Sequence, residues 1–120
     1  MRRKGALDRN AGSRHRRASF RARVSIPILC EQAQGETFAG TMVDIGLGGA
    51  CVECARVPLF STVLAVSVRL PGASGPSRLP AIVRWTKPSS FGVQFGLVGA
   101  RDTKLIADLV SQTTRQRHRT

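Results

Sequence analysis

Two short stretches of the chain combine residue types that suit an anionic ligand. The first is RASFR, which places Arg17 and Arg21 four residues apart. The second is DIGLGG, which spans residues 44 to 49 and pairs Asp44 with three glycines. Guanidinium groups bind phosphate oxygens through paired hydrogen bonds, and glycines let a ligand approach the backbone closely. Two plainer interpretations stay open. In the first, Arg17 and Arg21 are solvated residues of a basic segment and bind no ligand. In the second, Asp44 only caps the turn that follows it.

A Cys-x-x-C pair follows directly, at Cys51 and Cys54, and raises the question of a metal or redox site. The surrounding GACVECA is typical of a β-strand, in which positions three apart face opposite sides of the sheet. Both histidines, His15 and His118, lie near the chain ends, and the total of three cysteines is odd. We therefore predict reduced structural thiols, with metal or redox use as the alternatives.

Catalytic residue types are sparse. The chain has no tyrosine, its two histidines lie outside the central segment, and no two carboxylates have a spacing that would place them together. The GLGG segment lacks the lysine and hydroxyl residue of a phosphate-binding loop. These features predict a binding module that is not an enzyme and has no cofactor or metal.

The net charge of +12 raises the question of nucleic acid, but its distribution argues otherwise. Residues 1–23 hold nine Lys/Arg against one acidic residue, residues 24–114 hold seven against six, and residues 115–120 add three Arg. The central segment is therefore nearly neutral, whereas nucleic-acid-binding folds usually present a basic face. We expect solvated tails, or segments that become ordered around an anionic ligand, and keep a small basic nucleic-acid-binding protein as an alternative.

A length of 120 residues suits one domain, and no apolar run approaches the roughly 20 residues of a membrane-spanning helix. The basic start has no apolar segment behind it that would serve as a secretory signal. We predict a cytoplasmic protein, with an organelle transit peptide as the alternative for the arginine-rich start.

Alternating polarity and turn residues predict six strands, at residues 24–32, 37–44, 50–55, 62–70, 79–87 and 91–98. Residues 100–113 show helical spacing, with Asp102 as the expected N-cap. This pattern favours a small antiparallel barrel or sandwich with a helix over an open end. Within it, Trp85 is expected to pack the barrel, with stacking on a base as the alternative, and Arg84 to be solvated.

The order of these features resembles the PilZ domain, a small β-barrel receptor for the bacterial second messenger cyclic di-GMP. The resemblance covers roughly residues 14 to 110. RASFR matches the family's R-x-x-x-R, and DIGLGG matches its [DN]-x-S-x-x-G except that Gly46 replaces the serine. AIVRWTKPSSFGVQFG resembles the family's last hairpin. The sequence also departs from the family in placing Ala22 and Arg23 between the second arginine and the expected strand start at Val24.

The resemblance implies a mainly β fold, a six-stranded antiparallel barrel with a C-terminal α-helix. It places a disordered basic arm at residues 1–13, the barrel domain with its helix at residues 14–113, and a basic tail at residues 114–120. The implied ligand-binding residues are Arg16, Arg17, Arg21, Asp44, Gly46, Gly48 and Gly49. In this interpretation the arginines bind phosphate and guanine groups, while the Asp44 carboxylate accepts the N1 and N2 hydrogens of a guanine.

The implied function is that of a cyclic di-GMP receptor whose N-terminal arm changes on ligand binding and signals to a protein partner of unknown identity. Gly46 favours an alternative, a PilZ adaptor that has lost cyclic di-GMP binding.

Overall fold

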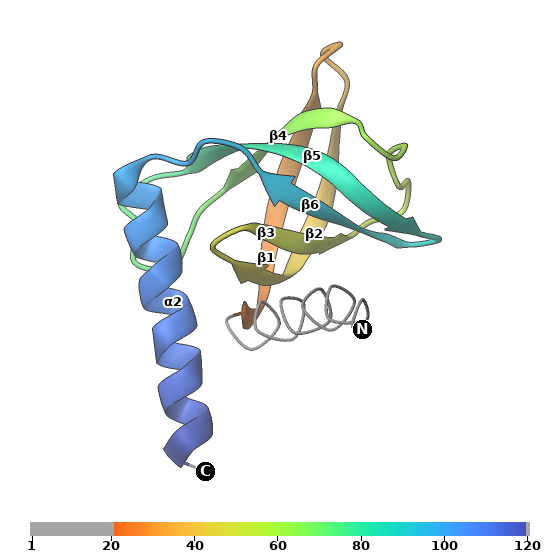
Figure 1. Cartoon of the computed structure of the whole chain (residues 1–120). Coiled ribbons are helices and arrows are strands. Elements are labelled where there is room, and N and C mark those ends of the chain that lie inside the picture. Colours follow the sequence, from red (N-terminus) through yellow and green to blue (C-terminus); the bar gives the residue numbers. More distant parts are fainter. Residues whose placement is uncertain (1–20, 120) are drawn as a thin grey trace, which may run out of the picture.

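The computed structural model describes the backbone of residues 21–119 and the side chains of residues 21–113. Arg16, Arg17 and the predicted arm at residues 1–13 lie outside these described residues. Six strands and one helix follow one another along the chain (Figure 1), namely β1 (Arg21–Gln32), β2 (Thr37–Gly46), β3 (Gly49–Glu53), β4 (Val63–Val68), β5 (Ser77–Lys87), β6 (Ser90–Phe95) and α2 (Ala100–Arg119).

The strands form a closed antiparallel barrel in the order β1-β2-β3-β6-β5-β4, which confirms the predicted fold class. One predicted boundary was wrong, because β1 begins at Arg21 and not at Val24. Arg21 pairs with Gly46 and Arg23 with Asp44, and a bulge between Arg23 and Ile26 follows. The strand therefore starts at the second arginine of the R-x-x-x-R motif, so this expected departure from the PilZ pattern does not exist.

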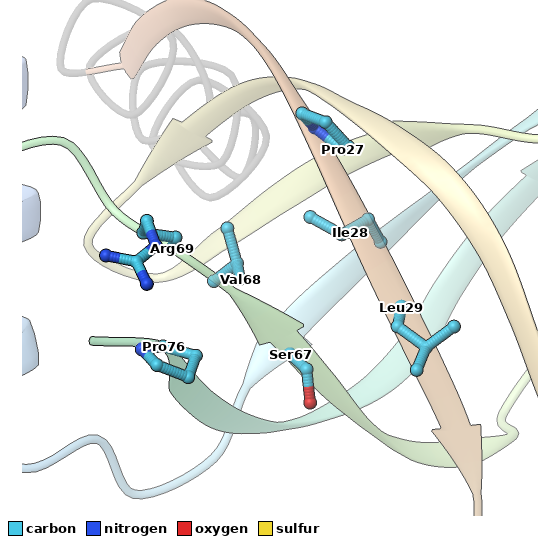
Figure 2. A pocket seen from close by; sticks show the side chains of 7 residues that line it. All are labelled: Pro27, Ile28, Leu29, Ser67, Val68, Arg69 and Pro76. Carbon is cyan, nitrogen blue, oxygen red and sulfur yellow. The ribbon is translucent and has the colours of Figure 1, made fainter.

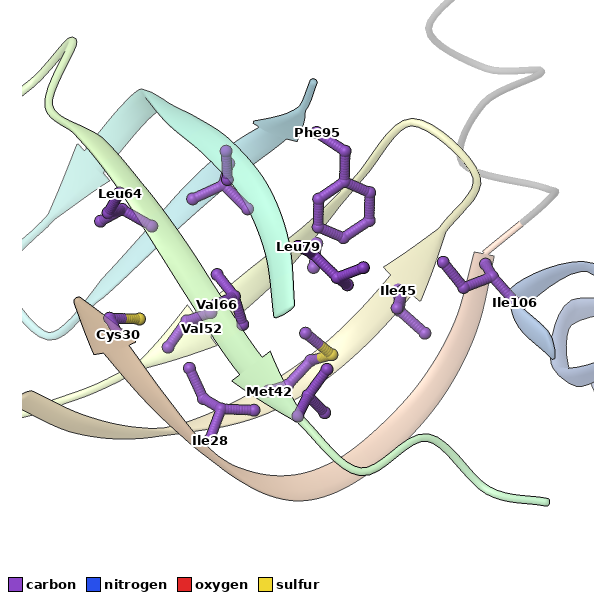
Figure 3. Close-up of a cluster of buried hydrophobic side chains, with 14 of the residues drawn as sticks. Ile28, Cys30, Met42, Ile45, Val52, Leu64, Val66, Leu79, Phe95 and Ile106 are labelled. Atoms are coloured by element: carbon purple, nitrogen blue, oxygen red, sulfur yellow. The ribbon is translucent and has the colours of Figure 1, made fainter. Parts of the chain in front are cut away.

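Alternating residues of the strands fill the barrel interior with apolar side chains (Figure 3). The largest fully buried side chains come from every strand and from α2, and include Cys30, Met42, Val52, Val66, Leu79, Phe91 and Ile106. Burial of each large apolar side chain stabilises the fold by about 1.5–3 kcal/mol. Because the interior is filled with side chains, a polar ligand has to bind on the outside of the barrel.

Helix α2 packs against one end of the barrel through Ile106 and Val110, which are buried. Figure 3 shows Ile106 beside Ile45 of β2. The prediction that Asp102 caps the helix was wrong, since α2 begins at Ala100 and Asp102 lies in its first turn. The helix also continues to Arg119, past the expected end at residue 113, because residues 111–119 contain no glycine or proline to end it.

Asp102 joins α2 to the barrel through a hydrogen bond that the Ser77 hydroxyl donates to its Oδ1, at 2.6 Å. Ser77 is only 4% exposed, so loss of the acceptor leaves a buried hydroxyl unsatisfied. We expect Asp102→Ala to lower the free energy of unfolding by about 1–3 kcal/mol, as measured by urea unfolding. Asp108→Ala is the matched control, because Asp108 is exposed on the same helix and pairs only with the exposed Lys104 at 3.3 Å. Equal losses in the two variants would contradict this role of the Ser77–Asp102 bond.

The three thiols occupy different environments. Cys30 is buried, and burial raises its pKa to about 12, with a further contribution from the nearby Cys54. Cys54 packs against the core, whereas Cys51 lies between the inward-facing Ala50 and Val52 and therefore faces outward. The two members of the Cys-x-x-C pair thus face opposite sides, as the strand pattern predicts.

Candidate functional site

Arg21 and Asp44 meet on the outer face of the barrel although they are 23 residues apart. The Nε and Nη2 atoms of Arg21 both donate hydrogen bonds to Oδ1 of Asp44, at 2.9 and 2.5 Å. The contact follows from the β1–β2 register, because Arg21 lies opposite Gly46 and Asp44 is its diagonal neighbour on the same face. The side chains are 28% and 32% exposed, so the pair is partly shielded from water but remains open to a ligand.

Gly46 lies directly opposite Arg21, two residues from Asp44 on β2, and is buried. Ile45 is buried in the core, so Asp44 and Gly46 on either side of it both face outward. Among the described residues, the glycines with positive φ are Gly35 and Gly72, which leaves Gly46 outside the left-handed region. Its φ angle is therefore one that a residue with a side chain adopts, and a serine here would have its side chain on the same face as Arg21.

Gly48 and Gly49 have different roles in the β2–β3 turn. Gly48 is exposed, its surroundings are open, and its carbonyl accepts a hydrogen bond from the Phe95 amide at 2.9 Å. At Gly49, a Cβ atom would lie 2.1 Å from the carbonyl oxygen of Val93 on β6. Gly49 is thus required by the close packing of β3 against β6, and of the two glycines only Gly48 leaves room for a ligand.

A row of outward-facing residues continues from Asp44 across the neighbouring strands. Asp44 pairs with Cys51 of β3, Cys51 pairs with Gly92 of β6, and Gly92 pairs with Trp85 of β5. The Trp85 indole covers Gly92, because a Cβ atom there would lie 2.0 Å from its Nε1 atom. The Lys87 ammonium lies 5.4 Å from the centre of the Trp85 ring. The row therefore joins the Arg21–Asp44 pair to an aromatic surface.

The prediction that Trp85 packs inside the barrel was wrong, since Trp85 is 41% exposed. Strict alternation would place it inside with Val83, which is fully buried. A bulge between Val83 and Trp85 adds Arg84 as an extra residue and turns the next side chain outward. Arg84 itself is exposed, as predicted, and donates to Oε1 of Gln94 at 2.9 Å.

Cys51, at the centre of this row, was not identified as a site residue from the sequence. Burial and then the Asp44 carboxylate raise the pKa of its thiol, while Arg21 and Lys87 act in the opposite direction. The thiol therefore stays protonated at neutral pH and is a poor nucleophile. The three charged residues Asp44, Arg21 and Lys87 thus bring both charge signs to the surroundings of Cys51.

The structure contains no cluster of three or more possible metal ligands within the described residues. Likewise, no helix in the described part of the chain is long and apolar enough to cross a membrane.

Comparison with known proteins gives a family match and several structural neighbours. The model of the PilZ domain family matches residues 15–112. Among solved structures, the PilZ domain of CeSA from a cellulose-synthesizing bacterium has a TM-score of 0.62 at 21% identity, over 77% of this chain and 95% of that chain. The PilZ domain of Escherichia coli YcgR, solved with c-di-GMP, has a TM-score of 0.62 at 15% identity, over 83% and 92%.

The motility inhibitor MotI/DgrA of Bacillus subtilis has a TM-score of 0.65 at 17% identity, over 82% of this chain and 50% of that chain. At these identities the neighbours establish the fold alone. A search of curated proteins finds no significant match.

Proposed function

The chain belongs to the PilZ domain family, a family of cyclic di-GMP receptors, and on this premise we propose that it binds cyclic di-GMP at the Arg21–Asp44 pair. The observation that supports this site is the contact itself. One residue from each of the two PilZ motifs lies on the same partly open area of the outer face. The family match supports the class of ligand, and the contact supports its location.

Asp44 has two functions in this proposal. Both Arg21 donors converge on Oδ1, so the contact orients the guanidinium and leaves Oδ2 outside it. Oδ2 is then an acceptor for the N1 and N2 hydrogens of a guanine, which are both donors. The remaining guanidinium donors of Arg21 suit a phosphate oxygen or the O6 and N7 atoms of guanine.

Arg16 and Arg17 complete the proposed site from the N-terminal side. Four residues span at most about 14 Å, so Arg17 is near enough to Arg21 to contact the same ligand. We expect the ligand to bring both arginines to the barrel and so change the surface that a protein partner contacts.

Trp85 provides a direct way to test the proposed site, because it is the chain's one tryptophan and lies in the same row as Asp44. An exposed indole also offers a surface on which a purine stacks. Titration with cyclic di-GMP is expected to change the Trp85 fluorescence in a saturable way. GMP at equal guanine concentration is the control for light absorption by the base. An identical response to both nucleotides would argue against a specific site.

The second candidate function is that of an adaptor without ligand, and Gly46 is the feature that favours it. A serine hydroxyl at this position would supply one more hydrogen bond to a ligand beside Arg21. Its absence weakens the proposed site without removing the Arg21–Asp44 pair.

Restoring this hydroxyl is expected to strengthen binding. Gly46→Ser should tighten cyclic di-GMP binding by about 1–2 kcal/mol, the net value of one hydrogen bond to a polar or charged group. The backbone at Gly46 does not oppose the change, since its φ lies outside the left-handed region. Paired titrations and thermal melts of the two proteins test this. Weaker binding at an unchanged melting temperature would show that Gly46 does not occupy the motif's serine position.

A further inference from the structure

A second surface of the barrel is centred on β4, the strand that lies opposite β3 in the closed barrel. In the closed strand order, β4 is three strands from β3 in both directions. The outward residues of β4 are Val63, Ala65 and Ser67, and the outward residues of β1 and β5 flank them. We name this surface the β4 face. Val63 is 57% exposed, and Leu29 of β1, which pairs with Ser67, is 48% exposed, so the face carries an apolar side chain near each end.

At one end of the β4 face, a tight turn holds two large apolar side chains in solvent. Leu59 is 80% exposed and Phe60 is 62% exposed. The turn is fixed by backbone hydrogen bonds from Thr62 to Leu59, from Ser61 to Val83 of β5 and from Val83 to Thr62, at 3.1, 2.9 and 2.9 Å. Ser61 has a φ of 72°, an unfavourable conformation for a residue with a side chain. A strained and well-bonded turn that exposes apolar groups indicates a docking function.

At the other end of the β4 face lies a shallow hollow of about 260 Å³ (Figure 2). It forms where the β1–β4 pairing stops at Ile28 and Val68. Its outer lining includes Pro27, Leu29, Arg69 and Pro76. The hollow is open to solvent and its exposed lining is mostly apolar, so a phenylalanine ring that lies in it would contact apolar groups.

We propose that two copies of this chain dimerise through the β4 face, with the Leu59–Phe60 turn of each copy in the hollow of the other. Val63 and Arg69, at the two ends of the face, are about 20 Å apart along the strand. The two-fold axis lies in the plane of the interface, perpendicular to β4, and passes over the strand between Ala65 and Ser67. Rotation about it places the Val63 end of one copy opposite the Arg69 end of the other. One rotation then places both turns against both hollows, as an isologous interface requires.

The charges of the β4 face suit the same arrangement. Glu31 of β1 pairs with Arg78 of β5 at 2.5 Å, and the two side chains are 44% and 61% exposed. The two-fold rotation brings Arg69 of one copy over Val63 of the other copy. Val63 is a diagonal neighbour of Glu31 within that other copy, so Arg69 comes close to a carboxylate of opposite charge. Residues 24–114 hold seven Lys/Arg against six acidic residues, so the barrels repel each other only weakly.

The interface is small. Three strands are roughly 14 Å wide, and the face is about 25 Å long, which gives a few hundred Å² per copy. Stable dimers bury about 800 Å² per partner, so we expect a weak dimer with a micromolar to millimolar dissociation constant. This inference does not rest on cyclic di-GMP binding, and its test is made without the nucleotide.

Sedimentation equilibrium of the full chain, from about 10 μM to 1 mM at about 0.15 M salt, tests the dimer. The unmodified chain should show a concentration-dependent dimer, and Phe60→Ser should raise its dissociation constant at least tenfold. Leu47→Ser is the matched control, because Leu47 is 54% exposed in the turn between β2 and β3, and β3 is the strand opposite β4. A monomer throughout the range, or equal weakening by both variants, would overturn the proposal.

A charge exchange tests the orientation of the two copies. Glu31→Arg and Arg69→Glu should each weaken the dimer by placing like charges together at two points. An equimolar mixture of the two variants should recover it, because each contact then joins opposite charges. Arg69 is exposed and the Glu31 side chain is 44% exposed, so cooperative thermal melts close to that of the unmodified protein are expected to show that the variants fold. Failure of the mixture to recover the dimer would overturn the two-fold arrangement.

Discussion

Arg17→Ala and Arg21→Ala are each expected to weaken cyclic di-GMP binding by tenfold or more. A bidentate guanidinium contact with guanine or phosphate contributes about 1–3 kcal/mol, and one tenfold change corresponds to about 1.4 kcal/mol. Arg9→Ala and Arg14→Ala are the controls, since they remove the same charge from the same basic segment outside the motif. Four calorimetric titrations at about 0.15 M salt, where exposed charges are screened, measure the difference.

The alternative is a general attraction between a basic segment and an anionic ligand. In that case all four substitutions reduce affinity almost equally, and the assignment of Arg17 and Arg21 is wrong. Arg21→Lys sharpens the comparison, because lysine keeps the charge but loses the planar fork that bonds twice to Oδ1 of Asp44. We expect Arg21→Lys to lose nearly as much affinity as Arg21→Ala.

Gly49→Ala is expected to have the second large effect, on stability. Its Cβ atom would lie 2.1 Å from the Val93 carbonyl oxygen, which is part of the β6 backbone and cannot rotate away. The two strands must separate, and we expect a loss of about 3 kcal/mol or more in the free energy of unfolding. Gly48→Ala is the control, because no atom lies within 4 Å of the Cβ position there.

Urea unfolding of both variants measures this difference. The control is expected to stay within about 0.5 kcal/mol of the unmodified protein, as is usual for exposed positions. If Gly49→Ala unfolds at the same urea concentration as Gly48→Ala, the close approach of β3 and β6 is not a constraint on the sequence.

Most of the barrel could be predicted because its interior is apolar and its strands alternate regularly. The segment AVSV in β4 and the turn glycines between β2 and β3 are clear local signals. The sequence at the start of β1 gives no such local signal. Ala22 is fully buried between Arg21 and Arg23, but two arginines around an alanine resemble the basic segment that precedes them. Only pairing with β2 makes them part of a strand, and such pairing is not visible in a local window.

The position of Trp85 was missed for a different reason. Alternation predicts its side chain inside the barrel, and the bulge at Arg84 reverses that direction. A bulge depends on two strands pairing with unequal numbers of residues, so one strand's sequence does not reveal it. For the same reason, Cys51 and Lys87 were not expected to share one outer surface with Asp44.

The candidate site itself rests on the resemblance more than on residue chemistry. Nothing in the composition indicates that Arg21 contacts Asp44, because the contact depends on the β1–β2 register. The structure also separates the motif glycines by role. Gly49 is required for strand packing, Gly48 leaves open space, and Gly46 faces the same side as the ion pair.

Calorimetric titration of the unmodified protein with cyclic di-GMP tests the central claim most directly. We expect saturable heat that fits a defined stoichiometry, and that persists at about 0.15 M salt because the site combines oriented donors with the Asp44 acceptor. No measurable heat at nucleotide concentrations up to about 1 mM, which corresponds to a binding free energy weaker than about −4.1 kcal/mol, would contradict the receptor function and leave the adaptor in its place.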